Sequence, residues 1–186
     1  CAFANNQHDL ESAITPDPAD SAFAKAMSMA KFRVISILDV NNQVYSRLWC
    51  IYELYLTLIL SKEQGIDGRL ATYTYYEHEF KDWGYNQYKS AVGLVDGLME
   101  NPSHDYNKSQ AYFPKDRLFK ALDVSIQDAK ASEKNDQIKI LNALVGRSGD
   151  NMKLEPLKNH KKYEILNNAV RGSFVSTQVC IKSANN

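Results

Sequence analysis

Cysteine is scarce in this sequence. Its 186 residues include three cysteines, Cys1, Cys50 and Cys180. They are far apart, odd in number and form no CxxC pair, so the pattern supports neither a disulfide framework nor a zinc site. We therefore expect no bound metal, and we expect an intracellular, reducing compartment. The pattern does not distinguish the cytoplasm from an organelle.

An excess of charge of one sign and a long hydrophobic run are also missing. Lys plus Arg and Asp plus Glu number 22 each, so charge gives no reason to expect nucleic acid or an anionic membrane as a partner. The apolar run over residues 48–60 is shorter than the roughly 20 residues that span a bilayer. We therefore expect no membrane span, and peripheral association with a membrane stays open. The chain also has no glycine-rich phosphate loop.

Aromatic residues, in contrast, are plentiful. The chain has eleven tyrosines and seven phenylalanines, which can fill a hydrophobic core or a protein interface. Composition alone does not separate these two uses. The length suits one domain, or one domain with a sizeable extension.

Helix and strand patterns alternate in the first part of the chain. Apolar residues at helical spacing predict a helix over residues 21–31. The compact apolar run 34–38 predicts a strand buried on both faces, and a long helix follows from about 46 to 62. A second strand is expected over residues 69–76. This order favours an α/β fold with a mostly parallel sheet of about four or five strands flanked by helices.

We divide the chain into three parts. Residues 1–76 form the α/β core, residues 77–113 an aromatic-rich insertion, and residues 114–186 the remainder of the α/β domain with added C-terminal helices. The insertion has one predicted helix around residues 90–99. In the last part we expect a strand within 118–129.

Two helices complete the predicted C-terminal part. One is capped by Ser132 and ends at Gly146, because serine favours the start of a helix and glycine its end. The other begins near Lys161 and is predicted to be broken or frayed near Gly172.

Glu53 is the only residue from Leu48 to Leu60 that is charged at neutral pH. It shares a helical stripe with Trp49 and Cys50, and the opposite stripe is also apolar. Burying an unpaired carboxylate is costly, so three arrangements are open. Glu53 faces a cleft, or it pairs with Arg47 or Arg33, or burial raises its pKa and keeps it protonated.

The stretch SRLWCIYEL, together with the helix and strand before it, resembles the middle of Toll/interleukin receptor (TIR) domains. The similarity covers roughly residues 20–76 and centres on Trp49, Cys50, Glu53 and Leu54. The first ten residues also look like part of a broader set of TIR-like and heterokaryon-incompatibility-like proteins of microbial eukaryotes. A second motif of that set is similar to six residues here: Ala131, Ser132, Asp136, Ile140, Leu141 and Asn142.

The resemblance implies a TIR/flavodoxin-like fold and two activities. Many TIR domains act by homotypic assembly, and a subset cleave NAD at the nicotinamide–ribose bond with a glutamate that corresponds in position to Glu53. A carboxylate near the anomeric carbon stabilises an oxocarbenium-like transition state. The residues expected to contact NAD are Trp49, beside Glu53, and Asn6 and Asp39, at strand ends. The first strand of the family, one wall of its nucleotide cleft, is expected upstream of Cys1.

Each of these residues also has an ordinary structural interpretation. Glu53 can be a satisfied carboxylate that fixes its helix, Trp49 and Cys50 can be core, and Asn6 can belong to a turn. We therefore expect a TIR-like interaction module or accessory subunit that acts through a protein partner or self-association. The alternative is an NAD glycohydrolase with Glu53 as the catalytic carboxylate, for which NAD is a substrate and no cofactor is needed.

Overall fold

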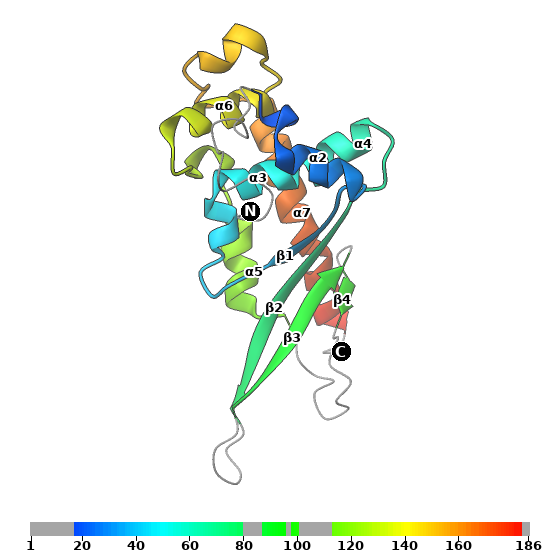
Figure 1. Ribbon diagram of the computed structural model, residues 1–186. Coiled ribbons are helices and arrows are strands. Elements are labelled where there is room, and N and C mark those ends of the chain that lie inside the picture. Colours follow the sequence, from blue (N-terminus) through cyan, green and yellow to red (C-terminus); the bar gives the residue numbers. More distant parts are fainter. Residues whose placement is uncertain (1–16, 80–86, 96–97, 101–112, 184–186) are drawn as a thin grey trace, which may run out of the picture.

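One mixed sheet runs through the molecule, with its strands in the order β1-β2-β3-β4 (Figure 1). The computed structural model describes residues 17–79, 87–95, 98–100 and 113–183. β1 (Arg33–Ile37) pairs in parallel with β2 (Arg69–Glu79). β3 (Gln87–Val95) pairs antiparallel with β2, and β4 (Leu98–Glu100) pairs antiparallel with β3. The fold is therefore mixed α/β.

The expectation of a mostly parallel sheet is wrong, because β1–β2 is the only parallel pairing among the described strands. β2 continues to Glu79, beyond Tyr73, its last residue paired with β1. β3 runs back along this extension. A short connection between successive strands gives antiparallel pairing, since a parallel neighbour needs a crossover of a dozen or more residues.

β3 and β4 also occupy the stretch where the sequence predicted a helix over 90–99, so that prediction is wrong. Val92 and Leu94 are buried on the face of the sheet that contacts the helices, which we call the inner face. Gly93 lies between them on the outer face, where a Cβ would clash with the ring of Tyr73, its partner on β2. Because every second residue is buried, this segment forms a strand and not a helix.

The helices on either side of β1 confirm the sequence predictions. α2 (Ala22–Met29) begins after Ser21, whose Oγ accepts a hydrogen bond from the Ala24 N–H at 3.2 Å. After β1, one continuous helical stretch contains α3 (Leu48–Tyr55), the π-helical turn η3 (Leu56–Leu60) and α4 (Ser61–Glu63). The predicted long helix over 46–62 matches this stretch closely.

α5 (Lys115–Leu122) covers the first part of residues 118–129, and the 3-10 turn η5 (Ile126–Asp128) lies in the rest, so the prediction of a strand there is wrong. Arg117, Leu118 and Ala121 are buried. Their spacing places them on one side of a helix, whereas a strand would have pointed Leu118 and Ala121 to opposite faces.

The last two long helices differ from expectation in their details. α6 (Lys134–Leu144) has Glu133 as its N-cap, so the predicted Ser132 cap is wrong. Its predicted end is confirmed, because Gly146 has a φ of 84°. α7 (Lys161–Ser183) is continuous through Gly172, so the predicted break is wrong. Val170 and Phe174 are buried on either side of that glycine and anchor the helix there.

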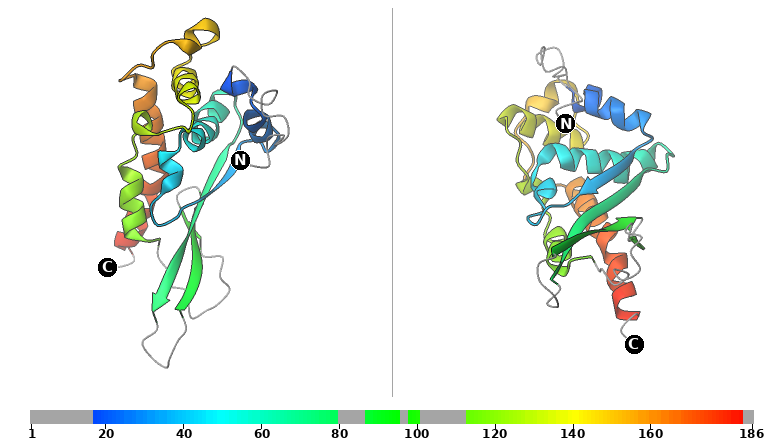
Figure 2. Two further views of the ribbon diagram at one scale, coloured as in Figure 1. Left: turned by 60° about the vertical axis from the view of Figure 1, so that its left-hand side comes forward. Right: turned by 60° about the horizontal axis from the view of Figure 1, so that its bottom comes forward.

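The core lies between the inner face of the sheet and the helices. Short 3-10 turns link the elements: η1 (Pro18–Asp20), η2 (Gln43–Ser46), η5 (Ile126–Asp128) and η6 (Gly149–Lys153). α5 and α7 pack side by side on one side of the sheet (Figure 2). The Phe174 ring lies 5.9 Å from Tyr45 and 6.3 Å from Phe113, between centroids. Among the described helices, none combines the length and the apolar character that a membrane crossing requires.

Candidate functional site

α3 presents three of the four residues at the centre of the TIR resemblance on its less buried side. Trp49, Cys50 and Glu53 are half-buried. Four other residues of the helix face the core and are buried: Leu48, Ile51, Tyr52 and Leu54. The stripe predicted from helical spacing is therefore present, and it lies at the boundary between core and solvent.

Trp49 is the point where three helices meet. Its indole Nε1–H donates a hydrogen bond to Asp136 Oδ2 on α6 at 3.1 Å, and its ring lies 5.8 Å from the Phe23 ring on α2. Asp136 belongs to the second motif of the resemblance, 87 residues along the chain. The fold therefore brings the two motifs into contact, which no local pattern could have predicted.

Burial raises the pKa of Glu53 above its ordinary value of 4.5, and the charge of Arg47 at the start of α3 lowers it in part. Burial also raises the pKa of the Cys50 thiol, and the negative charge of Glu53 adds to that effect. The pKa of Glu53 is thus shifted in the direction that burial predicts, and the nearby positive charge of Arg47 opposes that shift. A raised thiol pKa means that Cys50 is protonated at neutral pH and is a poor nucleophile.

A pocket of about 500 Å³ opens beside Trp49 at the start of α3. It is lined by Ser46, Arg47, Leu48, Trp49, Asp128, Lys130, Ala131 and Ser132. Two backbone hydrogen bonds hold its walls together, from Leu48 N–H to Lys130 O at 2.8 Å and from Lys130 N–H to Ser46 O at 2.9 Å. Trp49 lines this pocket and Glu53 does not.

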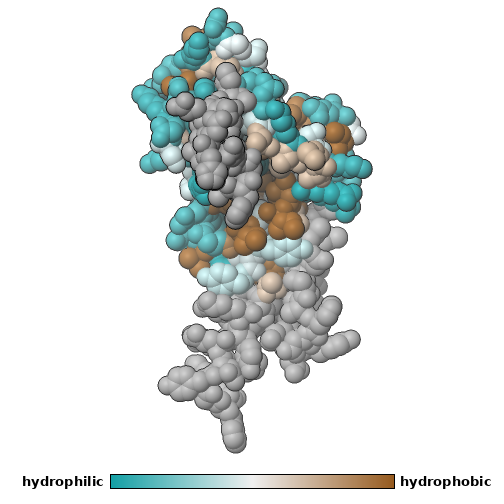
Figure 3. Space-filling view, viewed as in Figure 1, coloured by the Kyte–Doolittle hydropathy of each residue, from teal (hydrophilic) through white to brown (hydrophobic). Residues whose placement is uncertain are grey.

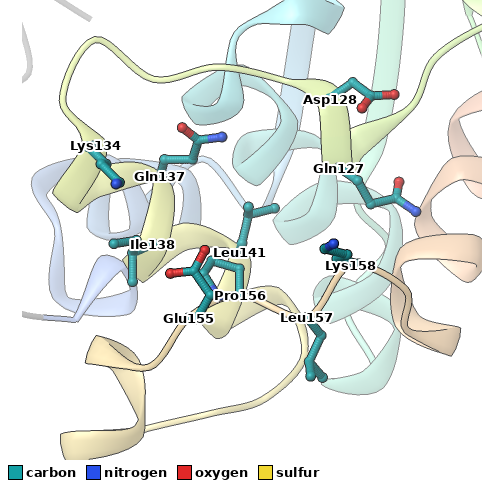
Figure 4. A pocket seen from close by; sticks show the side chains of 10 residues that line it. All are labelled: Gln127, Asp128, Lys134, Gln137, Ile138, Leu141, Glu155, Pro156, Leu157 and Lys158. Atoms are coloured by element: carbon teal, nitrogen blue, oxygen red, sulfur yellow. The ribbon is translucent and has the colours of Figure 1, made fainter.

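Two further hollows adjoin this pocket at Asp128, which lines all three. One, of about 340 Å³, lies between the η2 region and the chain after α5, and includes Asn42, Tyr45 and Lys120. The other, of about 350 Å³, lies between η5, α6 and residues 155–158, with Leu141 on α6 among its lining residues (Figure 4). All three hollows thus surround η5, away from the sheet's extension.

The other residues expected to contact NAD have different surroundings. Asp39 follows β1, where its Oδ1 accepts a hydrogen bond from the Gln43 N–H at 2.9 Å and so caps η2. It lines none of the three hollows. Asn6 lies outside the described residues. Trp49 and Glu53 are therefore the candidates that the described chain brings together.

β1 exposes two of its three apolar side chains, Ile35 and Ile37, while Val34 packs against the core. Ser36 points inward and is 6% exposed, whereas Ile35 and Ile37 point outward and are 68% and 73% exposed. Figure 3, in the orientation of Figure 1, shows hydrophobic side chains gathered over β1. The prediction that this strand is buried on both faces is therefore wrong: an apolar run indicates a strand but not what covers it.

The backbone of β1 is also open along one edge. Arg69 N–H donates to Phe32 O and Leu38 N–H donates to Tyr73 O, so the even-numbered residues point their polar groups at β2. The odd-numbered residues point theirs away from β2. Within the described chain, no hydrogen bond uses the backbone groups of Ile35 or Ile37 on that side. We call Ile35, Ile37 and this open edge the β1 surface.

Arg117 is a buried residue that sequence reasoning missed. Its guanidinium donates to the Thr74 hydroxyl and to Tyr75 O, and it lies 4.4 Å from the centre of the Tyr75 ring. Asn42 Nδ2 donates to Arg117 O at 2.7 Å. These contacts tie α5 to β2 and to the loop after β1. The helical spacing of Arg117, Leu118 and Ala121 was the signal that could have placed this residue on a buried helix face.

Comparison of the sequence with protein-family models, with curated proteins and with solved structures gave no match. Nor do the described side chains contain a group of three or more His, Cys, Asp or Glu residues placed to hold a metal ion.

Proposed function

We propose that this chain is a TIR-like interaction module, or an accessory subunit, that acts through protein–protein assembly. The β1 surface is the observation that carries this proposal. Ile35 and Ile37 are 68% and 73% exposed side by side on one face of one strand. Exposed apolar side chains that gather in one place mark interaction sites more often than single exposed residues do.

The open edge adds to this support. Proteins commonly protect a free edge with a proline, an inward-pointing charge or a bulge, because unpaired backbone groups attract another strand. β1 has none of these at Ile35 and Ile37. The balance of 22 positive and 22 negative residues removes long-range repulsion between copies of the chain.

The test is the mass of the full-length protein in solution as a function of concentration, by sedimentation or by light scattering after size exclusion. We expect the protein to associate as its concentration rises, and Ile37→Lys to stay monomeric because the lysine places a charge on the contact. Ile165→Lys is the matched control, since Ile165 is 44% exposed on α7. A protein that is monomeric at every concentration, or an Ile37→Lys variant that associates like the wild type, would contradict the proposal.

A second candidate function is NAD glycohydrolysis, and it is favoured by the half-buried position and raised pKa of Glu53 beside Trp49. In that reaction the bond between nicotinamide and ribose breaks, the electron pair leaves with nicotinamide, and water adds to the ribose carbon with loss of a proton. The ionised Glu53 would stabilise positive charge on the ribose as the bond breaks.

Release of nicotinamide from NAD by the purified protein tests this second candidate. Glu53→Gln should abolish release, whereas Glu63→Gln, an exposed glutamate on the same helical stretch, should leave it unchanged. Absence of release above the blank, at concentrations where the protein associates, would rule this candidate out.

A further inference from the structure

We propose that β1 pairs antiparallel with β1 of a second copy of this chain, about a two-fold axis at Ser36. This inference rests on the proposed assembly function and specifies the partner and the geometry of the contact. The two sheets would then join edge to edge into one continuous sheet, with both outer faces on the same side.

The backbone of β1 fits this pairing. In an antiparallel arrangement centred on Ser36, Ile35 lies opposite Ile37 of the second copy, and Ile37 lies opposite its Ile35. Because both isoleucines point their N–H and C=O groups away from β2, each pair exchanges two hydrogen bonds. About four new backbone hydrogen bonds result, and they use every open edge group of these two residues.

The side chains fit the same register. The stretch RVISILD, residues 33–39, is self-complementary about Ser36. Its outward isoleucines meet isoleucines, which brings four exposed apolar side chains together on one face. Arg33 lies opposite Asp39 of the second copy, and opposite charges directly across two strands stabilise their pairing.

Both charged residues are available for this contact. Arg33 is an exposed residue at the start of β1. Asp39 uses its Oδ1 to cap η2 through the Gln43 N–H, and the carboxylate's other oxygen has no hydrogen bond within the described chain. A register centred on Ile35 would instead place Arg33 opposite Ile37 and lose this complementarity.

The two-fold arrangement limits the assembly to a pair. A contact between identical surfaces is closed, because each copy uses its own β1 edge to cover that of its partner. β1 lies at one end of the described strand order, so the contact consumes that edge and leaves no second β1 edge for a filament. The protein should therefore form dimers, and no larger assembly, as its concentration rises.

Cysteine pairing tests the register. With Cys1, Cys50 and Cys180 replaced by serine, Ile35→Cys and Ile37→Cys are prepared as separate full-length proteins. Opposed residues of a hydrogen-bonded antiparallel pair have Cα atoms about 5.5 Å apart, within the range of a disulfide. Mild oxidation of an equal mixture should therefore give a disulfide-linked heterodimer. Either variant alone should cross-link at least tenfold less, because two copies of residue 35 are offset by two positions along the strands.

The outcomes separate this inference from the proposed function. One outcome is that Ile37→Lys abolishes association but the mixed cysteine variants form no heterodimer disulfide. That result would overturn the β1–β1 pairing, while assembly through the β1 surface would still be supported. Stronger cross-linking of Ile35→Cys alone would overturn the register centred on Ser36. Arg33→Glu places a negative charge opposite the negative charge of Asp39 of the second copy, and should raise the dissociation constant of the dimer about tenfold. An unchanged dissociation constant in that variant would contradict the Arg33–Asp39 contact.

Discussion

α3 and β1 are both apolar, yet they use their isoleucines in opposite ways. Ile51 on α3 is fully buried, whereas Ile35 on β1 is 68% exposed. On β1 an inward-facing buried position is taken by Ser36, whose hydroxyl lies close to the Tyr45 hydroxyl but not in normal hydrogen-bond geometry. α3 therefore follows the pattern of a chain that folds around its own core. β1 has two of its three apolar side chains, Ile35 and Ile37, where no described part of the chain buries them.

The largest expected difference is in the free energy of unfolding of two isoleucine-to-alanine variants. Ile51→Ala removes a fully buried side chain and should lower the free energy of unfolding by about 3 kcal/mol, through lost burial and the cavity left behind. Ile35→Ala should change it by less than about 0.5 kcal/mol in the monomer. Urea unfolding at low protein concentration measures both. Equal losses for the two variants would mean that Ile35 is covered in the monomer.

The contact between α3 and α6 gives the next largest effect. Trp49→Phe keeps a ring but removes the hydrogen bond to Asp136, and should cost about 1.5 kcal/mol because the acceptor is charged. Asp136→Asn should cost less, since its amide oxygen can still accept. The double variant should lose little more than Trp49→Phe alone. Additive losses would show that the two side chains do not interact.

A smaller effect on the free energy of unfolding is expected from Ser36, the buried polar residue of β1. Ser36→Ala removes a buried hydroxyl that has no hydrogen bond of normal geometry within the described chain, only a close contact with the Tyr45 hydroxyl, so the free energy of unfolding should stay constant or rise by up to about 1 kcal/mol. The same urea measurement applies. A clear loss of stability would indicate that Ser36 has a hydrogen-bond partner in solution, and would weaken the contrast between the two faces of β1.

The smallest effect concerns the pH dependence of stability. The folded-state pKa of Glu53 is raised above 4.5, so between 4.5 and that pKa the folded chain binds more protons than the unfolded chain. The contribution of Glu53 to stability therefore falls as pH rises through this window. Glu53→Gln should match the wild type below the window and be slightly more stable at neutral pH. Thermal unfolding across this pH range measures it, and a less stable glutamine variant at neutral pH would contradict the raised pKa.

Local patterns were sufficient where one face of an element decides its structure. The apolar spacing in residues 21–31 predicted α2, and the sequence also predicted the α3–α4 stretch over 46–62 and a strand over 69–76, which is part of β2. They failed for 90–99 and 118–129. In 90–99 the apolar residues fit either period, and pairing with β2 made the segment a strand. In 118–129 the helical spacing of Leu118 and Ala121 was overlooked, and it places both residues on the buried side of α5, which packs against α7.

The candidate site was predictable to a similar extent. The helical wheel placed Trp49 beside Glu53, as the structure does. It could not reveal that Asp136 holds Trp49, because 87 residues separate them. Nor could an apolar run reveal that Ile35 and Ile37 face solvent, since exposure depends on which elements cover a strand. The open edge of β1 likewise becomes visible only when the sheet order is known.

Amide hydrogen exchange of β1 as a function of protein concentration shows whether copies of the chain assemble through the β1 surface. We expect the amides of Ile35 and Ile37, which have no hydrogen-bond acceptor within the described chain, to exchange more slowly as the concentration of the full-length protein rises. Leu38, whose N–H already donates to Tyr73 O, should show a smaller change and serves as the internal reference. Exchange at Ile35 and Ile37 that is independent of concentration would contradict assembly through the β1 surface.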